Sequence, residues 1–301
     1  MAEAVYGLPP AGLAASMPEA IQLSPLIVGA AAIETLEGGS LDRIVIAAPP
    51  GTLERRYVLA HGLRAVREGG EVVALAPKTR GGARLARELA TFGCEVAESA
   101  RRHQRICRCL RPSILEGIEA AVAAGGRQYV LPLGLWSQPG VFSWDRLDPG
   151  SALLLAQPWE PAGTGADFGC GCGVLARAAL ASPAVSRLTL IDIDRRALDA
   201  ARRNIDDPRA RFLQADLRRP AKGLAELDFV IMNPPFHDGG AEDRALGKTL
   251  VGAAAAVLRR GGVCRLVANV ALPYESALAA SFAEVRQLAR EGGYKVLEAR
   301  R

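Results

Sequence analysis

Histidine is scarce in this sequence, which has only three among 301 residues. Six cysteines are present, but the pairs Cys107-x-Cys109 and Cys170-x-Cys172 lack the two-residue gap of common zinc knuckles. No histidine is placed to complete a metal site with either pair. The sequence therefore predicts no bound metal and six free thiols, as expected for a protein in a reducing compartment.

Long apolar runs are also missing. The longest uncharged apolar stretches, Pro25–Ile33 and Val251–Leu258, are too short to cross a bilayer, which takes about 20 residues of helix. The N-terminus carries Glu3 and has no basic flank followed by an apolar segment, so it does not resemble a signal peptide. We expect a soluble, cytoplasmic protein.

Lysine is nearly absent: the chain has four lysines against 33 arginines and a net charge of +5. The planar fork of arginine suits phosphate recognition, but a compositional bias explains the count as well. The stretch Arg101–Arg111 holds five arginines and no acid. It predicts either a solvated hairpin edge or a phosphate-contacting patch in which Arg101, Arg102 and Arg105 bind RNA, and the sequence favours neither.

The length allows two domains of roughly 150 residues each. A stretch rich in Gly, Pro and Trp at 125–150 is the predicted linker, which places the first domain at 1–130 and the second at 131–301. One order of elements occurs in both domains, at 43–76 and 229–268: an apolar strand, Pro-Pro, a helix, Gly-Gly and another strand. The first copy has Ala48 where the second has Asn233. We interpret the first domain as a related but truncated α/β unit that lacks the chemistry, with a further helix expected over Ile27–Leu36.

A glycine-rich turn follows the first predicted strand of the second domain. Asp167 precedes Gly169, Gly171 and Gly173, whose backbone permits a tight turn and close approach of a ligand. Asp192 ends the next strand, 19 residues after Gly173, where an acid suits hydrogen bonds to ribose hydroxyls. An acid ahead of the glycines could hold the ammonium of an amino-acid ligand.

The next two strands also end in polar residues. Asp216 follows the third strand, and the apolar run Phe229–Met232 ends at Asn233-Pro234-Pro235-Phe236. Open α/β sheets bind ligands at the carboxyl ends of their strands. The Asn side chain and a Pro carbonyl beside an aromatic ring suit a planar base with an exocyclic amino group, although the tetrapeptide alone is equally consistent with an ordinary turn.

The glycine turn also fits a dinucleotide fingerprint, since Gly171-x-Gly173-x-x-Ala176 has the required spacing. A dehydrogenase would need neither Asp167 before the glycines nor Asp216 after the third strand. The Asn-Pro-Pro-Phe ending of the fourth strand argues against it as well. These three features argue against a dehydrogenase.

The set Asp-x-Gly-x-Gly-x-Gly, Asp192, Asp216 and Asn-Pro-Pro-Phe resembles class I S-adenosylmethionine-dependent methyltransferases that modify amino nitrogens. More narrowly, the chain is similar to the RsmC/RlmG family of ribosomal RNA (guanine-N2)-methyltransferases. The segments that carry this resemblance are Phe142-Ser143, Leu147–Leu155, Asn233–Gly239, Val267–Asn269, Leu272–Tyr274 and Gly292–Leu297. It is strong over 140–301 and looser over 40–115.

The resemblance implies an α/β fold in which a Rossmann-like class I methyltransferase domain follows a truncated, degenerate methyltransferase-like domain. It implies that Asp167 and the three glycines hold the methionine part of S-adenosylmethionine. Asp192, with Ile193, would bind the ribose, and Asp216, with Leu217, the adenine. The expected substrate is ribosomal RNA or the small ribosomal subunit, most simply 16S rRNA. The sequence does not reveal the oligomeric state, and we expect a monomer.

The resemblance also implies the catalytic roles. The Asn233 oxygen and the Pro234 carbonyl would accept the N–H groups of the guanine amine, Phe236 would stack on the base, and Pro235 and His237 would contact the substrate. Alternatives remain: a protein-glutamine N5 or adenine-N6 methyltransferase, whose motifs tend to have Tyr or Trp after Pro-Pro, or a cofactor-dead RNA-binding protein for ribosome assembly.

Two departures from the family pattern are visible. The strand before the glycine turn reads Gly163-Thr164-Gly165-Ala166 where apolar residues are usual, so we expect a short or loosened strand. Cys172 stands where a small hydroxyl or Ala is more common, and a thiol should fit there.

Overall fold

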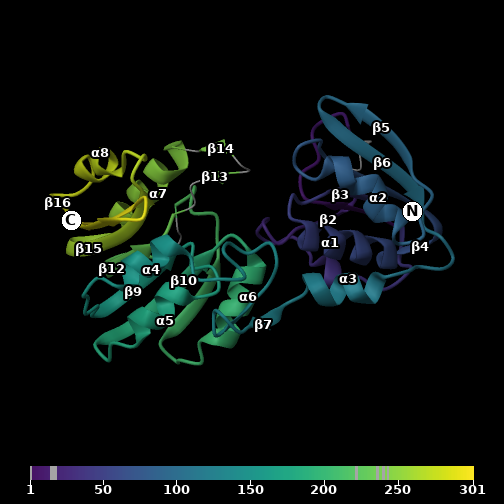
Figure 1. Ribbon diagram of the computed structural model, residues 1–301. Helices are drawn as coiled ribbons and strands as arrows, with labels where there is room; N and C mark the ends of the chain where they lie inside the picture. Colours follow the sequence, from purple (N-terminus) through teal and green to yellow (C-terminus); the bar gives the residue numbers. More distant parts are fainter. Residues whose placement is uncertain (1, 14–18, 221–222, 235–236, 239–240, 243) are drawn as a thin grey trace. The chain divides into compact units, whose positions relative to one another are not determined.

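The computed structural model describes residues 2–13, 19–220, 223–234, 237–238, 241–242 and 244–301 (Figure 1). The chain divides into two compact units. The first comprises residues 1–128 and 138–140, and the second comprises residues 129–137 and 141–301. Each unit is built on its own β-sheet.

The sheet of the second unit has seven strands in the order β11-β10-β9-β12-β15-β17-β16. The strands are β9 (Gly163–Phe168), β10 (Val185–Asp192), β11 (Ala210–Gln214), β12 (Leu227–Met232), β15 (Leu258–Asn269), β16 (Glu284–Glu291) and β17 (Tyr294–Arg300). Neighbours from β11 to β15 pair in parallel, whereas β17 is antiparallel to both β15 and β16.

Helices cover both faces of this sheet (Figure 1). They are α4 (Pro149–Leu155), α5 (Val174–Leu180), α6 (Arg195–Asn204), α7 (Arg244–Val257) and α8 (Tyr274–Ala279). Because strand side chains alternate, Phe229 and Ile231 of β12 pack with α4, α5 and α6, whereas Val230 and Met232 pack with α7 and α8. Burial on both faces explains why Phe229–Met232 of β12 is a continuous apolar run.

The glycines of β9 make room for an aromatic cluster. A Cβ on Gly165 would lie 2.2 Å from the Phe229 ring, and the Trp159 ring meets Phe229 edge-on at 5.3 Å between centroids. The Thr164 N–H donates to Asp228 Oδ2 at 2.7 Å. The expected loosening of this strand was wrong, because β9 pairs with β10 on one side and β12 on the other.

The sheet of the first unit has the order β2-β1-β3-β4-β6-β5. Its elements are β1 (Glu3–Tyr6), β2 (Ile21–Leu23), β3 (Leu41–Ala47), α1 (Thr52–Ala65), β4 (Val66–Pro77), α2 (Leu85–Ala90), β5 (Ala97–Arg101), β6 (Gln104–Leu110) and α3 (Ile118–Gly125), with single 3-10 turns at Ile33–Thr35 and Gly82–Arg84.

The two sheets share one topology. Strand order and direction in β2-β1-β3-β4-β6-β5 match those in β10-β9-β12-β15-β17-β16. The repeat seen in the sequence corresponds to β3-α1-β4 and β12-α7-β15. Among the described residues, the first sheet has no counterpart of β11, so it is the shorter version of the same arrangement.

The helix expected over Ile27–Leu36 was wrong. Only Ile33–Thr35 forms a single 3-10 turn. The Ala31 N–H donates to the Gln22 carbonyl beside β2, and Gly29 has a φ of +82°, which an α-helix does not allow. The bridge to the sheet replaces the helical hydrogen bonds.

Short strands complete the structure: β7 (Gln128–Val130) pairs with β8 (Leu135–Ser137), and β13 (His237–Asp238) with β14 (Ala241–Glu242). Within the described ranges, no helix is both long and apolar enough to cross a membrane. The same residues contain no cluster of three or more metal-ligating side chains. All six cysteines are free, as predicted, and buried.

Candidate active site

The predicted polar residues meet at one edge of the second sheet. Because β11, β10, β9 and β12 are adjacent and parallel, their carboxyl ends lie side by side. Asp167 is the fifth residue of the six in β9, and Asp192 is the last residue of β10. Asp216 follows β11 by two residues, and Asn233 directly follows β12. This edge is where a ligand of an open α/β sheet is expected.

The glycine turn connects β9 to α5. Gly169, Gly171 and Gly173 all have positive φ, at +71°, +53° and +92°. A Cβ added at Gly169 or Gly171 would have no atom within 4 Å, so the backbone there borders open space. At Gly173 a Cβ would lie 2.9 Å from Ile205, the residue that follows α6. The first two glycines thus leave room for a ligand, and the third permits close packing.

Asp167 is fully buried below this turn. Among the described residues, neither of its carboxyl oxygens has a hydrogen-bond partner. Burial, with the nearby Asp192 charge, raises the pKa of Asp167 to about 8. The backbone N–H of Ala176 is near enough to lower this pKa by less, but it does not form a hydrogen bond of normal geometry. A buried carboxyl without a partner is costly unless a cation or donor joins it, so Asp167 is suited to a ligand that carries a positively charged group.

Asp192 connects the glycine turn to the end of β10. Its Oδ2 accepts from the Gly171 N–H at 2.9 Å, and its Oδ1 accepts from the Asp194 N–H at 2.8 Å. Burial raises the pKa of Asp192 to about 6, against the lowering effect of these backbone donors. Each carboxylate oxygen has a second lone pair, so both can still accept from a ligand hydroxyl.

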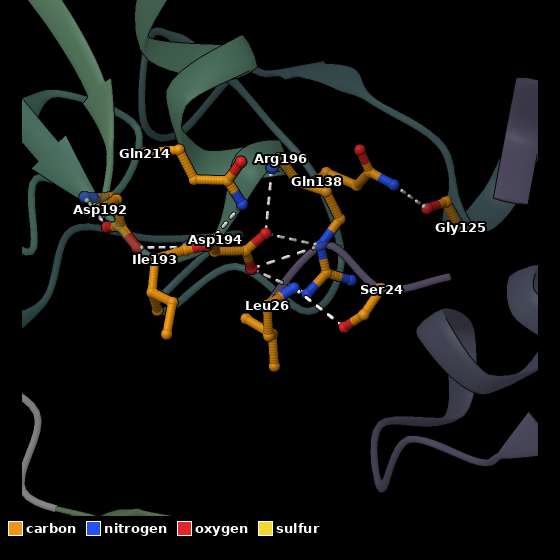
Figure 2. Close-up of polar contacts among 10 residues, drawn as sticks. Ser24, Leu26, Gly125, Gln138, Asp192, Ile193, Asp194, Arg196 and Gln214 are labelled. Atoms are coloured by element: carbon orange, nitrogen blue, oxygen red, sulfur yellow. Dashed lines mark hydrogen bonds and ion pairs between the residues drawn. The ribbon is translucent and has the colours of Figure 1, made fainter. Parts of the chain in front are cut away.

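The residues after Asp192 are held in place from two sides (Figure 2). The Ile193 carbonyl accepts from Gln214 Nε2 at 3.0 Å. Asp194 caps α6 by accepting from the Arg196 N–H at 3.0 Å, and it forms a buried ion pair with the Arg196 guanidinium at 2.8 Å. This network gives the loop a defined shape.

Asp216 lies near Asp192 because the Ala215 N–H donates to the Asp192 carbonyl at 3.1 Å. Its Oδ1 accepts from the backbone and the side chain of Arg218, and the Arg218 guanidinium holds the pKa of Asp216 below its usual value. Leu217 is buried in the core beneath β9 and β12 rather than open to solvent. It supports this edge of the sheet through packing.

Asn233 is held by two residues that the sequence did not assign to the site. Its Nδ2 donates to Asp148 Oδ2 at 2.8 Å and to Ser151 Oγ at 2.9 Å. Its Oδ1 is buried and, within the described part of the chain, unpaired. Pro234 is buried as well. Asp-Pro-Gly-Ser at 148–151 is a recognisable helix start, but its contact with Asn233 spans 85 residues and has no local signal.

The structure says less about the other residues predicted to contact the substrate after Pro234. Pro235 and Phe236 lie outside the described residues. The backbone of His237 belongs to β13, which pairs with β14.

The arginine stretch forms the hairpin β5-β6 at the edge of the first sheet. Arg101 ends β5, and Arg102 is in the turn with a φ of +49°. Arg102 donates to the Ala11 carbonyl at 2.9 Å, and Arg105 pairs with Glu98 at 2.8 Å. Two of the three predicted RNA contacts therefore have partners within the chain, and the side chain of Arg101 remains exposed.

Cys172 fits its position in the glycine turn. It is buried beside Leu135 and Ala200, which raises the pKa of its thiol to about 11. The Asn204 amide donates to the Cys172 carbonyl and the Trp136 carbonyl, each at 2.9 Å. Asn204 thus links the glycine turn to β8 through hydrogen bonds.

These features match one ligand. The unpaired buried carboxyl of Asp167 calls for a cation, the open backbone at Gly169 and Gly171 allows close approach, and Asp192 can accept from hydroxyls. S-adenosylmethionine has an ammonium and ribose hydroxyls, and the carboxylates of Asp167 and Asp192 are suitable acceptors for them. The fold and this edge of the sheet together define a class I S-adenosylmethionine-dependent methyltransferase.

Comparisons with known proteins agree with this class. The family model of the methyltransferase small domain matches residues 132–298. A Pseudomonas aeruginosa protein named ribosomal RNA small subunit methyltransferase C is 34% identical over 98% of this chain and 93% of its own length. A Yersinia pseudotuberculosis protein of the same name is 33% identical over 89% and 77%. The chain therefore belongs to the family of these small-subunit ribosomal RNA methyltransferase C proteins.

A solved structure supports the fold over the whole chain. It is a T. thermophilus 16S rRNA N2 methyltransferase (RsmC) in complex with AdoMet and guanosine. The likeness covers all of this chain and 88% of that one, with a TM-score of 0.79 and 24% sequence identity. The two-unit architecture is therefore shared.

Proposed function

We propose that this protein transfers a methyl group from S-adenosylmethionine to the exocyclic N2 amine of a guanine in 16S ribosomal RNA. The observation that carries the proposal is the Asn233 amide. Its nitrogen is fully engaged, and its buried oxygen has no partner among the residues that the structure describes. The family of the chain supports the choice of ribosomal RNA, and its relatives' names support the small subunit. A cytoplasmic location follows from that substrate.

S-adenosylmethionine, when bound, supplies an electrophilic methyl group on a positively charged sulfur. Asp167 would hold the ammonium, and the glycine turn would border the methionine part. Asp192 and Ile193 would bind the ribose, and Asp216 the adenine amine. Leu217 would act through the packing beneath that site, since it is buried in the core.

The guanine amine is a weak nucleophile because its lone pair is delocalised into the ring. The Asn233 oxygen and the Pro234 carbonyl would accept its two N–H groups and favour a pyramidal nitrogen. Phe236 would stack on the base and Pro235 and His237 would line its path. Positioning of this kind can contribute several kcal/mol without a strong base.

The first unit, near 1–130, is proposed to be a degenerate copy that supports or presents the substrate. In this copy the Pro-Pro carbonyls after β3 already have a partner within the chain. Arg55 donates to the Pro49 carbonyl at 3.2 Å and to the Pro50 carbonyl at 2.7 Å. Ala48 stands where the second copy has Asn233. Arg101, with Arg102 and Arg105 if they leave their partners, would contact phosphates.

The test uses purified protein, labelled S-adenosylmethionine and three acceptors: 16S rRNA or small subunits, DNA, and protein. We expect label in RNA, recovered as N2-methylguanosine. Asn233→Ala should stop the transfer while calorimetry shows that cofactor binding persists. Label recovered in protein glutamine or in adenine would refute the proposal, and so would a fully active Asn233→Ala protein.

A further inference from the structure

The Asn233 amide can adopt only one orientation in its pocket. Asp148 Oδ2 accepts both from the Ser151 N–H and from Asn233 Nδ2, each at 2.8 Å. An ionised carboxylate accepts hydrogen bonds and cannot donate them, so the amide must turn its NH₂ toward Asp148. Ser151 Oγ takes the second amide hydrogen at 2.9 Å. The Asn233 oxygen is therefore directed away from α4, where the described residues offer it no partner.

The start of α4 is itself fixed. Asp148 and Ser151 are both buried, and Asp148 caps the helix. Gly150 lies against the Tyr294 ring, where an added Cβ would approach to 2.9 Å. The carboxylate thus cannot move without unmaking the helix cap and this packing, which is the rigidity that a positioned polar group requires.

The charge of Asp148 matters for the proposed reaction, on which this inference rests. In that reaction the amine lone pair forms the nitrogen–carbon bond as the carbon–sulfur bond breaks, and the bonding pair stays on sulfur. Positive charge therefore moves to nitrogen, which then releases one proton to solvent. A hydrogen-bonded carboxylate polarises the amide between it and the amine and strengthens the amide oxygen as an acceptor. A fixed negative charge near developing positive charge stabilises the transition state more than the ground state.

We propose that Asp148 is a positioning residue for methyl transfer, acting through Asn233. It holds the amide with its oxygen free for the substrate amine, and its charge strengthens that oxygen as positive charge develops on the amine. Ser151 contributes the second anchor of the amide.

Asp148→Asn removes the negative charge of the side chain but keeps its size and shape. Asparagine keeps an oxygen that can accept both hydrogen bonds and is as good a helix cap as aspartate, so the fold should persist. We expect kcat to fall by about tenfold or more, while the KM for RNA and the Kd for the cofactor stay within about twofold. Ser151→Ala removes one of two anchors and should lower kcat by about threefold.

Matched controls lie near the amino ends of the parallel strands of the same sheet, away from the proposed site. Asp207→Asn alters an aspartate that accepts from the Arg209 N–H ahead of β11. Ser182→Ala alters a serine that donates to the Pro161 carbonyl. Both controls should leave kcat unchanged.

A wild-type kcat for Asp148→Asn would overturn the inference, as would a loss confined to KM or to cofactor affinity. Asn233→Ala is measured alongside. If Asn233→Ala is inactive and Asp148→Asn is fully active, only the role of Asp148 is wrong. If Asn233→Ala is itself active, the proposed function of the site fails first.

Discussion

Replacing Asp167 by asparagine removes the ionisable proton of the buried carboxyl below the glycine turn and preserves the side chain's volume. Burial and the Asp192 charge raise the pKa of Asp167 to about 8, against about 3.9 in an unfolded chain. The folded protein therefore binds this proton more tightly than the unfolded chain. The contribution of this bound proton to the free energy of unfolding is fully present below about pH 4. It declines as pH rises toward 8, by up to 1.36 kcal/mol per pH unit. By pH 8 the loss is on the order of 5 kcal/mol.

In the proposed site the ammonium of the cofactor pairs with the ionised carboxyl, which would reverse this penalty. Binding at pH 6.5 should therefore release close to one proton from the wild-type protein. Calorimetry in buffers of different ionisation enthalpy measures that number directly. Asp167→Asn should bind the cofactor more weakly, release no proton, and show flatter thermal stability between pH 5 and 8. Asp207→Asn serves as the control and should behave as the wild type.

Proton release close to zero in the wild-type protein would refute this reasoning, since it would mean that Asp167 is already ionised or stays protonated in the complex. Equal cofactor affinity in Asp167→Asn would also contradict the assignment of the ammonium to this carboxyl.

Two further predictions concern packing. Gly165→Val would drive a side chain into the Phe229 ring, which lies 2.2 Å from the position of an added Cβ; we expect a loss of about 1–3 kcal/mol in the stability of the second unit, measured by denaturant unfolding. Arg55→Met would leave Glu88 buried without the guanidinium that now bonds both its oxygens at 2.6 Å. That change should cost the first unit about 3–5 kcal/mol, and Arg55→Met with Glu88→Leu should recover much of it, as hydrogen exchange in β3 and β4 would report.

The strand ends of the second unit were predictable from sequence because a strand buried on both faces is a continuous apolar run. Asp192 and Asn233 each stop such a run, and parallel pairing brings their positions to one edge. The repeat of strand, Pro-Pro and helix was visible for the same reason. These features could be predicted because each depends on residues that are close together in the sequence.

The failures have a physical cause as well. The apolar stretch Ile27–Leu36 has helical composition, but a bridge to β2 and the backbone at Gly29 take precedence. Asp148 was visible only as a helix cap, since its bond to Asn233 joins residues 85 apart. The short strands β1 and β2 were missed because three or four residues carry too little periodicity.

The most direct test of the account is nucleoside mapping of 16S rRNA from cells that lack this protein, complemented with the wild-type chain or with Asn233→Ala. The account predicts that one N2-methylguanosine disappears without the protein, returns with the wild type and stays absent with Asn233→Ala. A 16S rRNA whose guanine methylation is the same in all three strains would contradict it.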